Sequence, residues 1–188
     1  LKDAGFEGEI RIHEKTLERY ATDESIFHIV PQIVLLPRSV KDVQIAVRVV
    51  KQESAEFPSL SLTARAAGTG LGGGSLSDSI VIDIKEHLNE IIKIDKKAGH
   101  VSVTAYAGTM WRDIEKALKE YDRYLPPYPA SKHICTIGGA VANNAAGPDS
   151  LRYGHVADWV ESLEVVLDDG EVYDVRPLSY KEFRTLQK

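Results

Sequence analysis

Short apolar runs flank one amphipathic stretch in the first third of the chain. Residues 33–36 are all apolar and Pro37 stops the run, which predicts a buried strand. Valines then recur at helical spacing, at positions 40, 43, 47 and 50, and predict a helix over residues 40–54 with Ser39 as its N-cap. Because another apolar run follows at residues 60–65, we predict a strand–helix–strand unit.

Two hairpins are predicted in the rest of the chain, after a further buried strand at residues 80–84. Apolar and polar residues alternate over residues 91–95 and 100–104, on either side of a short polar turn. The runs at residues 162–167 and 171–175 are joined by a strong Asp-Gly turn. We therefore expect small antiparallel sheets in this part of the chain.

Three further helical patterns complete the chain. Thr109 is expected to cap a helix over residues 110–121, and Ser179 to begin a terminal helix. A helical pattern around Leu17 and Tyr20 lies in an otherwise polar N-terminal stretch. These patterns locate the remaining helices but say little about what each one packs against.

The order of these elements predicts an α+β fold. We expect an N-terminal arm at residues 1–32 and a single domain at residues 33–188, with halves at residues 33–85 and 86–188. A chain of 188 residues can bury a substantial core, and no repeat or low-complexity linker interrupts it. The two halves are expected to grip an extended ligand between them.

The densest group of glycines lies between the predicted strands at residues 60–65 and 80–84. From Arg65 to Ser75 the chain reads Arg-Ala-Ala-Gly-Thr-Gly-Leu-Gly-Gly-Gly-Ser. Glycine adopts positive φ easily and lets another molecule approach the backbone, whose exposed N–H groups then form an anion-binding nest. The segment is a candidate phosphate-binding loop, and a glycine-rich turn without a ligand is the alternative.

Three common nucleotide-binding motifs do not fit this loop. Gly68, Gly70 and Gly73 match the Rossmann spacing, but a strand pattern follows them instead of the helix that this motif needs. Gly73 is followed by Gly74 and not by Lys, which excludes a Walker A loop. A kinase glycine-rich loop would require H-R-D and D-F-G motifs, and the sequence contains neither.

A second group of small residues lies between Thr136 and Gly147. Paired glycines and four alanines predict a short helix or turn that another group approaches closely, with N-terminal N–H groups that could face an anion. Asn143 and Asn144 offer amide donors and acceptors for a heteroaromatic edge or a ribityl chain. Close packing of a helix on a sheet also selects small residues and is the alternative here.

Composition narrows the possible classes. The net charge of −5 and the pI of about 5.7 give no basic surplus for a nucleic-acid partner. The single cysteine, Cys135, excludes an intrachain disulfide and an iron–sulfur site made by this chain alone. No apolar run reaches membrane-spanning length and no signal-peptide pattern opens the chain, so we expect a cytoplasmic location, with peripheral membrane association of a longer protein left open.

Taken together, these segments resemble the FAD-binding domain of the vanillyl-alcohol oxidase/PCMH flavoprotein superfamily. The branch that is most similar contains the FAD-linked D-lactate and D-2-hydroxyglutarate dehydrogenases and the glycolate oxidase D subunit. The resemblance covers roughly residues 20–175. It rests on the order and spacing of residues 20–25, 31–39, 65–75, 126–131, 136–147, 152–154 and 165–170. The family often has Asp where Tyr128 stands and Gly where Ala146 stands.

The resemblance implies a PCMH-type fold and two groups of cofactor contacts. The first loop would bind the FAD pyrophosphate through Arg65, Ala66, Ala67, Gly68, Thr69, Gly70, Leu71, Gly73, Gly74 and Ser75. The isoalloxazine and ribityl would be lined or supported by Pro129, Ser131, Thr136, Ile137, Gly138, Gly139, Ala142, Asn143, Asn144, Gly147, Tyr153 and Gly154. Some members link flavin covalently to a histidine at the position of Thr69, so we expect non-covalent FAD here.

Few side chains are candidates for chemistry of their own. No histidine pair has metal-ligand spacing, so we expect no metal site, and no nucleophile with a base is evident, so we name no catalytic residue. His133 and His155 could approach the flavin or a phosphate, or lie in solvated loops. Arg65 and Lys132 could balance the negative charge of the pyrophosphate or of a reduced flavin, or they could be ordinary surface residues.

The function implied by the resemblance is that of a cofactor domain in a flavin-dependent oxidoreductase, oxidising a 2-hydroxy acid by hydride transfer to flavin N5. A same-fold NADPH-dependent reductase of an enolpyruvyl sugar nucleotide and a non-catalytic nucleotide-binding module are the alternatives. In the resembling dehydrogenases a following cap domain holds the substrate. We expect that domain, and contact with an electron acceptor, to lie outside these residues, so that the chain alone is inactive.

Overall fold

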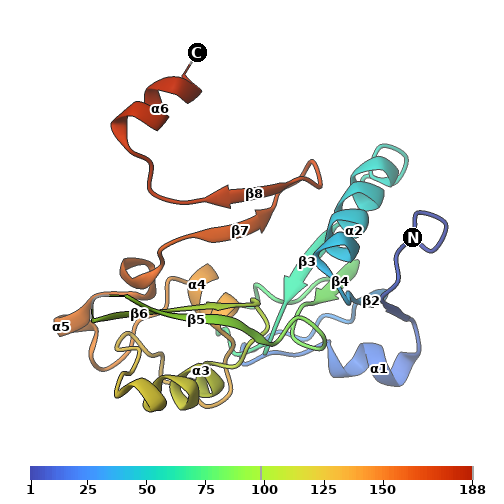
Figure 1. Ribbon diagram of the computed structural model, residues 1–188. Helices are drawn as coiled ribbons and strands as arrows, with labels where there is room; N and C mark the ends of the chain where they lie inside the picture. The colour runs from blue at the N-terminus through green and yellow to red at the C-terminus, as the bar shows by residue number, and fades with distance from the viewer. Residues whose placement is uncertain (98, 188) are drawn as a thin grey trace.

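A four-stranded sheet forms the first part of the molecule. The computed structural model describes residues 1–97 and 99–187. It places β1 (Glu9–Arg11), β2 (Ile33–Leu36), β4 (Ile80–Asp83) and β3 (Leu62–Arg65) side by side in that order (Figure 1). β2 and β3 both run parallel to β4, and β1 is the antiparallel partner of β2. The predicted strand–helix–strand unit is confirmed, with β4 lying between its two strands.

Helices pack on both faces of this sheet, because successive side chains of a strand point to opposite sides. α2 (Val40–Glu53) begins as predicted at Ser39, whose hydroxyl accepts the N–H of Asp42. The core on the α2 side consists of Phe6, Leu35, Ile45, Ala46, Val50, Ile80 and Ile82. The core on the side of α1 (Glu14–Arg19) consists of Val34, Leu36 and Val81, with Leu17 and Tyr20 packed against them.

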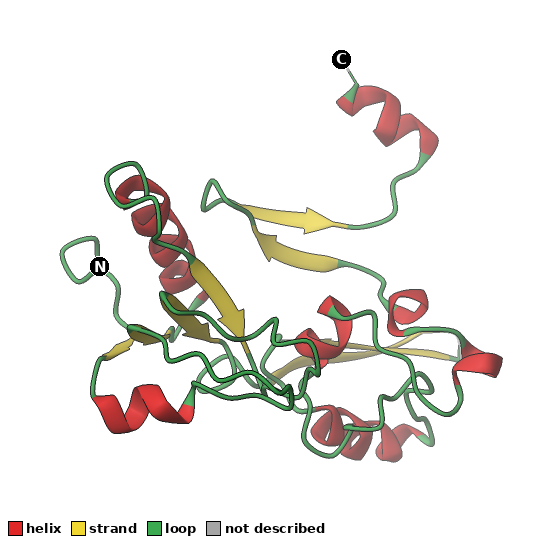
Figure 2. Cartoon of the chain, turned by 180° about the vertical axis from the view of Figure 1, so that it is seen from behind, coloured by secondary structure: helices red, strands yellow, loops and turns green. Residues whose placement is uncertain are grey.

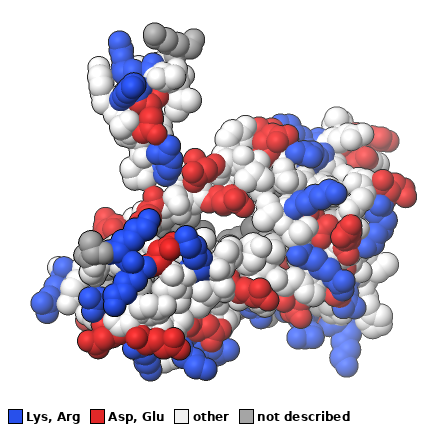
Figure 3. Space-filling view, in the orientation of Figure 1, with Lys and Arg blue, Asp and Glu red and all other residues white. Residues whose placement is uncertain are grey.

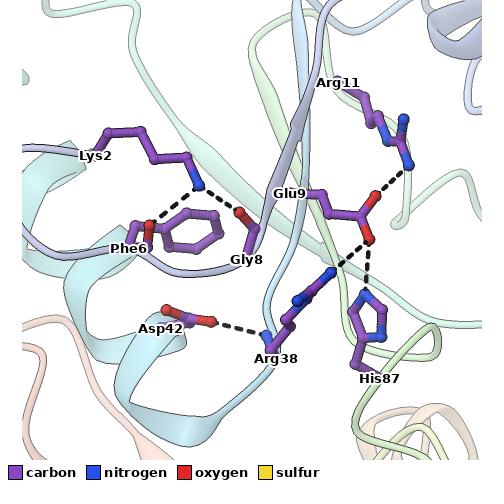
Figure 4. A network of polar contacts seen from close by, with 8 residues as sticks. All are labelled: Lys2, Phe6, Gly8, Glu9, Arg11, Arg38, Asp42 and His87. Atoms are coloured by element: carbon purple, nitrogen blue, oxygen red, sulfur yellow. Dashed lines mark hydrogen bonds and ion pairs between the residues drawn. The ribbon is translucent and has the colours of Figure 1, made fainter.

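The N-terminal residues are part of this sheet and its core. We expected an arm at residues 1–32, and the structure adds that this segment supplies β1 and a Phe6 side chain that is 2% exposed. Asp42 is 1% exposed, and its carboxylate accepts the backbone N–H groups of Glu7 and Arg38, each at 2.8 Å. Figure 4 shows the bond to Arg38 beside the contacts that Glu9 makes with Arg11, Arg38 and His87.

A second part is built around one hairpin and several short helices. The hairpin β5 (Ile91–Lys97) and β6 (His100–Ala105) is antiparallel as predicted. α3 (Trp111–Leu118) continues into a 3-10 turn, η1 (Lys119–Tyr121). Trp111 packs with Cys135, Ala140 and Val156. Ala140 belongs to α4 (Ile137–Ala142) and Val156 to the 3-10 turn η2 (Val156–Trp159). The short helix α5 (Ser150–Tyr153) lies between these two elements in the sequence.

The expected N-cap of α3 is wrong. Met110 occupies that position and makes no side-chain capping bond. The Thr109 hydroxyl instead donates to the Glu90 carbonyl at 3.0 Å, and Thr109 is 1% exposed. A buried hydroxyl must find an acceptor, and here the nearest one lies just before β5 and not in the helix.

The last hairpin extends from the second part back to α2. β7 (Leu163–Val166) and β8 (Val172–Val175) pair as predicted, and α6 (Tyr180–Leu186) begins at Ser179 with a capping box to Glu182 (Figures 1 and 2). At the hairpin tip the Gly170 carbonyl accepts Gln44 Nε2 at 2.8 Å and Arg48 Nη2 at 3.0 Å. The tip therefore connects the two parts, while the division at residue 85 stays a prediction.

Replacing Asp42 tests how the N-terminal segment is held. Asp42→Ala should lower the free energy of unfolding by about 2–3 kcal/mol, because two backbone N–H groups lose a carboxylate acceptor. Urea denaturation followed by circular dichroism measures the change. Lys41→Ala alters an exposed neighbour on the same helix and should leave the midpoint in place. Equal midpoints for the two variants would show that Asp42 does not hold the segment.

Candidate cofactor-binding site

The glycine loop connects two parallel strands that end at the same edge of the sheet. Arg65, the last residue of β3, lies opposite Asp83, the last residue of β4. Residues 66–79 return the chain from the end of β3 to the start of β4 without forming a helix. The rejection of a Rossmann fingerprint is therefore confirmed.

The backbone donors of this loop have no protein partner. Within the part of the chain that the structure describes, no N–H group of residues 66–75 donates to a protein acceptor. Gly68 and Gly73 have φ values of +67° and +73°, where glycine is favoured. A Cβ added to Gly72 or Gly74 would meet nothing within 4 Å. The loop is thus an open set of N–H donors with room for another molecule against it.

Arg65 holds the base of the loop. Its Nη1 donates to the Tyr20 carbonyl at 3.3 Å and its Nη2 to the Thr22 carbonyl at 2.7 Å. The guanidinium also lies over the Tyr20 ring, 5.4 Å from its centroid, and against Gly68, where an added Cβ would come within 2.6 Å of Nη2. Through these contacts Arg65 connects the start of the loop to residues 20–22. Its contact with a pyrophosphate stays a prediction.

The N-terminal amides of α4 are already occupied. Ile137 N–H and Gly138 N–H each donate at 2.8 Å, to the carbonyls of Thr109 and Ala107. Gly139 N–H donates to the Thr136 hydroxyl at 3.2 Å. The expectation that these amides face an anion is wrong, because they already donate to protein acceptors, two of them carbonyls of the loop before α3.

The two small-residue segments meet at Asn143. A Cβ added to Gly70 would lie 3.8 Å from Asn143 Nδ2, so the first loop and the end of α4 are close neighbours. The exposed Asn143 side chain forms no hydrogen bond within residues 1–97 and 99–187, whereas Asn144 Oδ1 accepts the Ala157 N–H at 2.9 Å. Asn143 thus keeps both its amide oxygen and its amide nitrogen available to a ligand, whereas the oxygen of Asn144 is already in use.

Close packing accounts for two of the glycines in the second segment. A Cβ on Gly138 would lie 2.5 Å from Ala107 Cβ and 2.6 Å from its carbonyl oxygen, and a Cβ on Gly147 would overlap the Tyr128 carbonyl. The packing alternative is therefore correct for these two positions. Of the two segments, the first loop is the one that holds open glycines, Gly72 and Gly74.

Comparison with known families settles what kind of domain this is. Residues 31–176 match the family described as FAD binding domain. The chain belongs to that family. Over its whole length it is 33% identical to the D-2-hydroxyglutarate dehydrogenase of Escherichia coli (strain K12), and it spans 18% of that protein. It is also 29% identical, over 76% of its length, to the glycolate oxidase subunit GlcD of Bacillus subtilis (strain 168), covering 29% of it.

A solved structure shows the same fold. This FAD-binding domain superposes on 6-hydroxy-D-nicotine oxidase from Arthrobacter nicotinovorans with a TM-score of 0.74, at 20% identity, over 92% of its own length and 36% of the oxidase. The expected PCMH-type fold is confirmed, and so is the resemblance to D-2-hydroxyglutarate dehydrogenases and a glycolate oxidase subunit.

The remaining predicted contacts lie around α4 and α5. Pro129 and Thr136 are buried, Ser131 and Ile137 are half-buried, and Ala142 is exposed. The Tyr153 ring packs edge-on against Tyr124 and Trp159, both at 6.4 Å between centroids, and Gly154 has a φ of +74°. Sequence reasoning missed Trp159, whose Nε1 donates to the Tyr153 carbonyl at 2.8 Å. A spacing of six residues is typical of neither a helix face nor a strand face, so the sequence did not indicate this contact.

The other polar candidates lie at the surface or in ion pairs. His133 and His155 are exposed, as expected for solvated loop histidines. Lys132 pairs with Glu115 at 3.2 Å and lies 4.1 Å above the Tyr128 ring. Cys135 is buried, and this burial raises the pKa of its thiol. Residues 20–25, which the sequence connected with the resemblance, contact the glycine loop directly.

Neither a metal-binding cluster nor a membrane-spanning helix occurs in the described part of the chain. Among the described residues, no three His, Cys, Asp or Glu side chains come together as metal ligands. In the same residues no helix has both the length and the apolar character needed to cross a membrane. The cytoplasmic location stays a prediction.

Two glycine substitutions should separate packing from open space. Gly138→Ala should lower the free energy of unfolding by about 1–3 kcal/mol, because its Cβ has no room beside Ala107. Gly72→Ala is the matched change in open space and should leave stability almost unaltered. Thermal melting without ligand measures both. A larger loss in Gly72→Ala than in Gly138→Ala would contradict the assignment.

Proposed function

We propose that this domain binds FAD non-covalently, with the pyrophosphate against the N–H groups of residues 66–75 and the ribityl and flavin ring along residues 136–147. The observation that carries the proposal is the set of loop amides that no acceptor in the described part of the chain uses. Backbone N–H groups left open at a loop are costly unless water or a ligand accepts their hydrogen bonds. A pyrophosphate, with its many acceptor oxygens, suits such a set.

Local dipoles, rather than overall charge, would provide this affinity. The chain carries a net charge of −5, which opposes an anionic cofactor. Acidic and basic side chains are interspersed over the face seen in Figure 3. Oriented N–H groups act at short range, so they can hold a phosphate in spite of the unfavourable net charge.

Residues of the second segment would orient the rest of the cofactor. The Asn143 side chain lies next to Gly70 and has no hydrogen bond to any residue that the structure describes, and it is the proposed amide contact for the ribityl or the flavin edge. Tyr153 and Gly154, fixed by the aromatic contacts with Trp159, would support that part of the site. Thr69 cannot form the covalent bond that a histidine makes, which supports non-covalent binding.

We further propose that the domain serves an enzyme that oxidises a 2-hydroxy acid. When bound, FAD supplies the hydride acceptor, and the protein supplies position and electrostatics. The names of the relatives, D-2-hydroxyglutarate dehydrogenase and glycolate oxidase subunit, support this substrate class. The chain spans less than a fifth of the first of these, so substrate binding and contact with an electron acceptor are proposed for residues beyond this domain.

Titration with FAD tests the cofactor site. The chain should bind FAD and quench its fluorescence, and Gly70→Val should raise the Kd at least about tenfold, because branched carbons would fill the space between the loop and Asn143. Ala55→Val is the control, a similar enlargement at an exposed position after α2. Acid precipitation should release all of the flavin into the supernatant. Unchanged affinity in Gly70→Val would move the site away from this loop, and flavin in the pellet would rule out non-covalent binding.

A turnover assay tests the proposed reaction. The FAD-loaded chain alone should bind flavin but reduce an artificial acceptor negligibly with D-lactate, glycolate or D-2-hydroxyglutarate, because catalysis requires the substrate to be held against the flavin with water excluded. The same chain within its complete reading frame should oxidise at least one of them. Equal rates for both would show that these residues already contain the whole active site. No turnover by either would refute the substrate class.

A further inference from the structure

Residues 20–27 lie along the glycine loop and contact it at its start, middle and end. At the start, Arg65 donates to the carbonyls of Tyr20 and Thr22. The Glu24 N–H then donates to the Gly68 carbonyl at 3.1 Å. This segment therefore touches the loop through groups that leave the loop N–H donors free.

Asp23 and Phe27 hold the far end of the loop. Asp23 Oδ2 accepts the Ser75 hydroxyl at 3.0 Å, while its Oδ1 accepts the Ser25 N–H at 2.8 Å. Partial burial works to raise the pKa of Asp23, but the hydrogen bonds from Ser25 and Ser75 and the charge of Arg65 together lower it. The Phe27 ring lies against Gly73, where an added Cβ would be 2.7 Å from Cδ2. Asp23 is thus ionised at neutral pH and can accept both bonds.

The start of the segment is anchored to the buried edge of the sheet. The Tyr20 hydroxyl donates to Asp83 Oδ2 at 2.8 Å, and Asp83 is 3% exposed. Burial, together with the Asp83 charge, raises the pKa of Tyr20, so its phenol remains a donor. Asp83 also accepts the Lys85 N–H at 2.7 Å. The end of β4 therefore fixes the point from which residues 20–27 reach the loop.

We propose that residues 20–27 are a positioning segment for the glycine loop, and that Asp23 is its central positioning residue, holding Ser75 so that the loop N–H groups are arranged before the pyrophosphate arrives. This role rests on the FAD site proposed above. Leu71 to Gly74 are four consecutive non-β-branched residues, and within the described part of the chain none of their N–H groups donates to a protein acceptor. Such a stretch has a large conformational entropy to lose on binding. Contacts that order it in advance reduce that cost.

The proposal predicts a selective loss of affinity. Asp23→Ala should raise the Kd for FAD about tenfold, as expected when a hydrogen bond to a charged acceptor is lost. The Kd for riboflavin, which has no pyrophosphate, should stay unchanged. Asp23→Asn keeps a polar group that can meet both Ser25 and Ser75, and it should restore most of the FAD affinity. Asp3→Ala, at an exposed aspartate in the N-terminal turn, is the control.

A second measurement needs no flavin. Leu71 is 81% exposed, so chymotrypsin can cut there in the ligand-free protein. Asp23→Ala and Phe27→Ala should both speed this cleavage, while cleavage at the exposed Leu178 and Tyr180 should stay the same. Phe27 is half-exposed, so its variant keeps the test usable if Asp23→Ala folds poorly.

The outcomes separate this role from the FAD site itself. If the wild-type chain does not bind FAD, the proposed function fails, and the cleavage rates still decide whether residues 20–27 order the loop. Wild-type FAD affinity and wild-type cleavage at Leu71 in both variants would overturn the positioning role. Equal losses for FAD and riboflavin would also overturn it, as would an Asp23→Asn variant as weak as Asp23→Ala.

Discussion

The parallel pairing of β3 with β4 is the constraint on which the candidate site depends. Parallel neighbours end at the same edge of a sheet, so the chain must travel back along the sheet before β4 can begin. Residues 66–79 make this return without a helix, and the amides of residues 66–75 therefore have neither a sheet ladder nor a helix to satisfy them. The glycines make the path possible, and the open donors are its chemical consequence.

The rest of the first part holds this return path in place. β2 and the helices α1 and α2 bury both faces of β4, so that its end at Asp83 is fixed in the core. The Tyr20 hydroxyl donates a hydrogen bond to that carboxylate, and the Arg65 guanidinium lies over the Tyr20 ring. The residues around the loop thus use side chains and carbonyls for support, which leaves the loop N–H groups to something outside the protein.

The second part brings a different surface to the same place. Its α4 is held by carbonyls from the stretch before α3, and its glycines at 138 and 147 allow the backbone to pack closely. The hairpin tip at Gly170 reaches α2 and ties this part to the first. Asn143 is thereby placed beside Gly70, and an extended cofactor can contact both segments. Membership of the FAD binding domain family agrees with this arrangement.

Local patterns in the sequence were sufficient for most elements. The helix that begins at Ser39, the strands at residues 33–36 and 80–84, and the Asp-Gly hairpin all follow from spacing, capping and turn chemistry between near neighbours. The glycine loop and its difference from a Rossmann motif were also evident, because the strand pattern follows directly. The family resemblance came from the order of these local motifs.

Only the tertiary structure decided how the polar groups are shared. Arg65 faces the carbonyls of Tyr20 and Thr22, and the α4 amides face Ala107 and Thr109, because partners distant in the chain come close after folding. The same is true of Thr109, which bonds to Glu90 and not to the helix that it precedes. Sequence reveals which donors and acceptors exist within a few residues. Which of them remain free for a ligand depends on every long-range contact, and so it is decided by the fold.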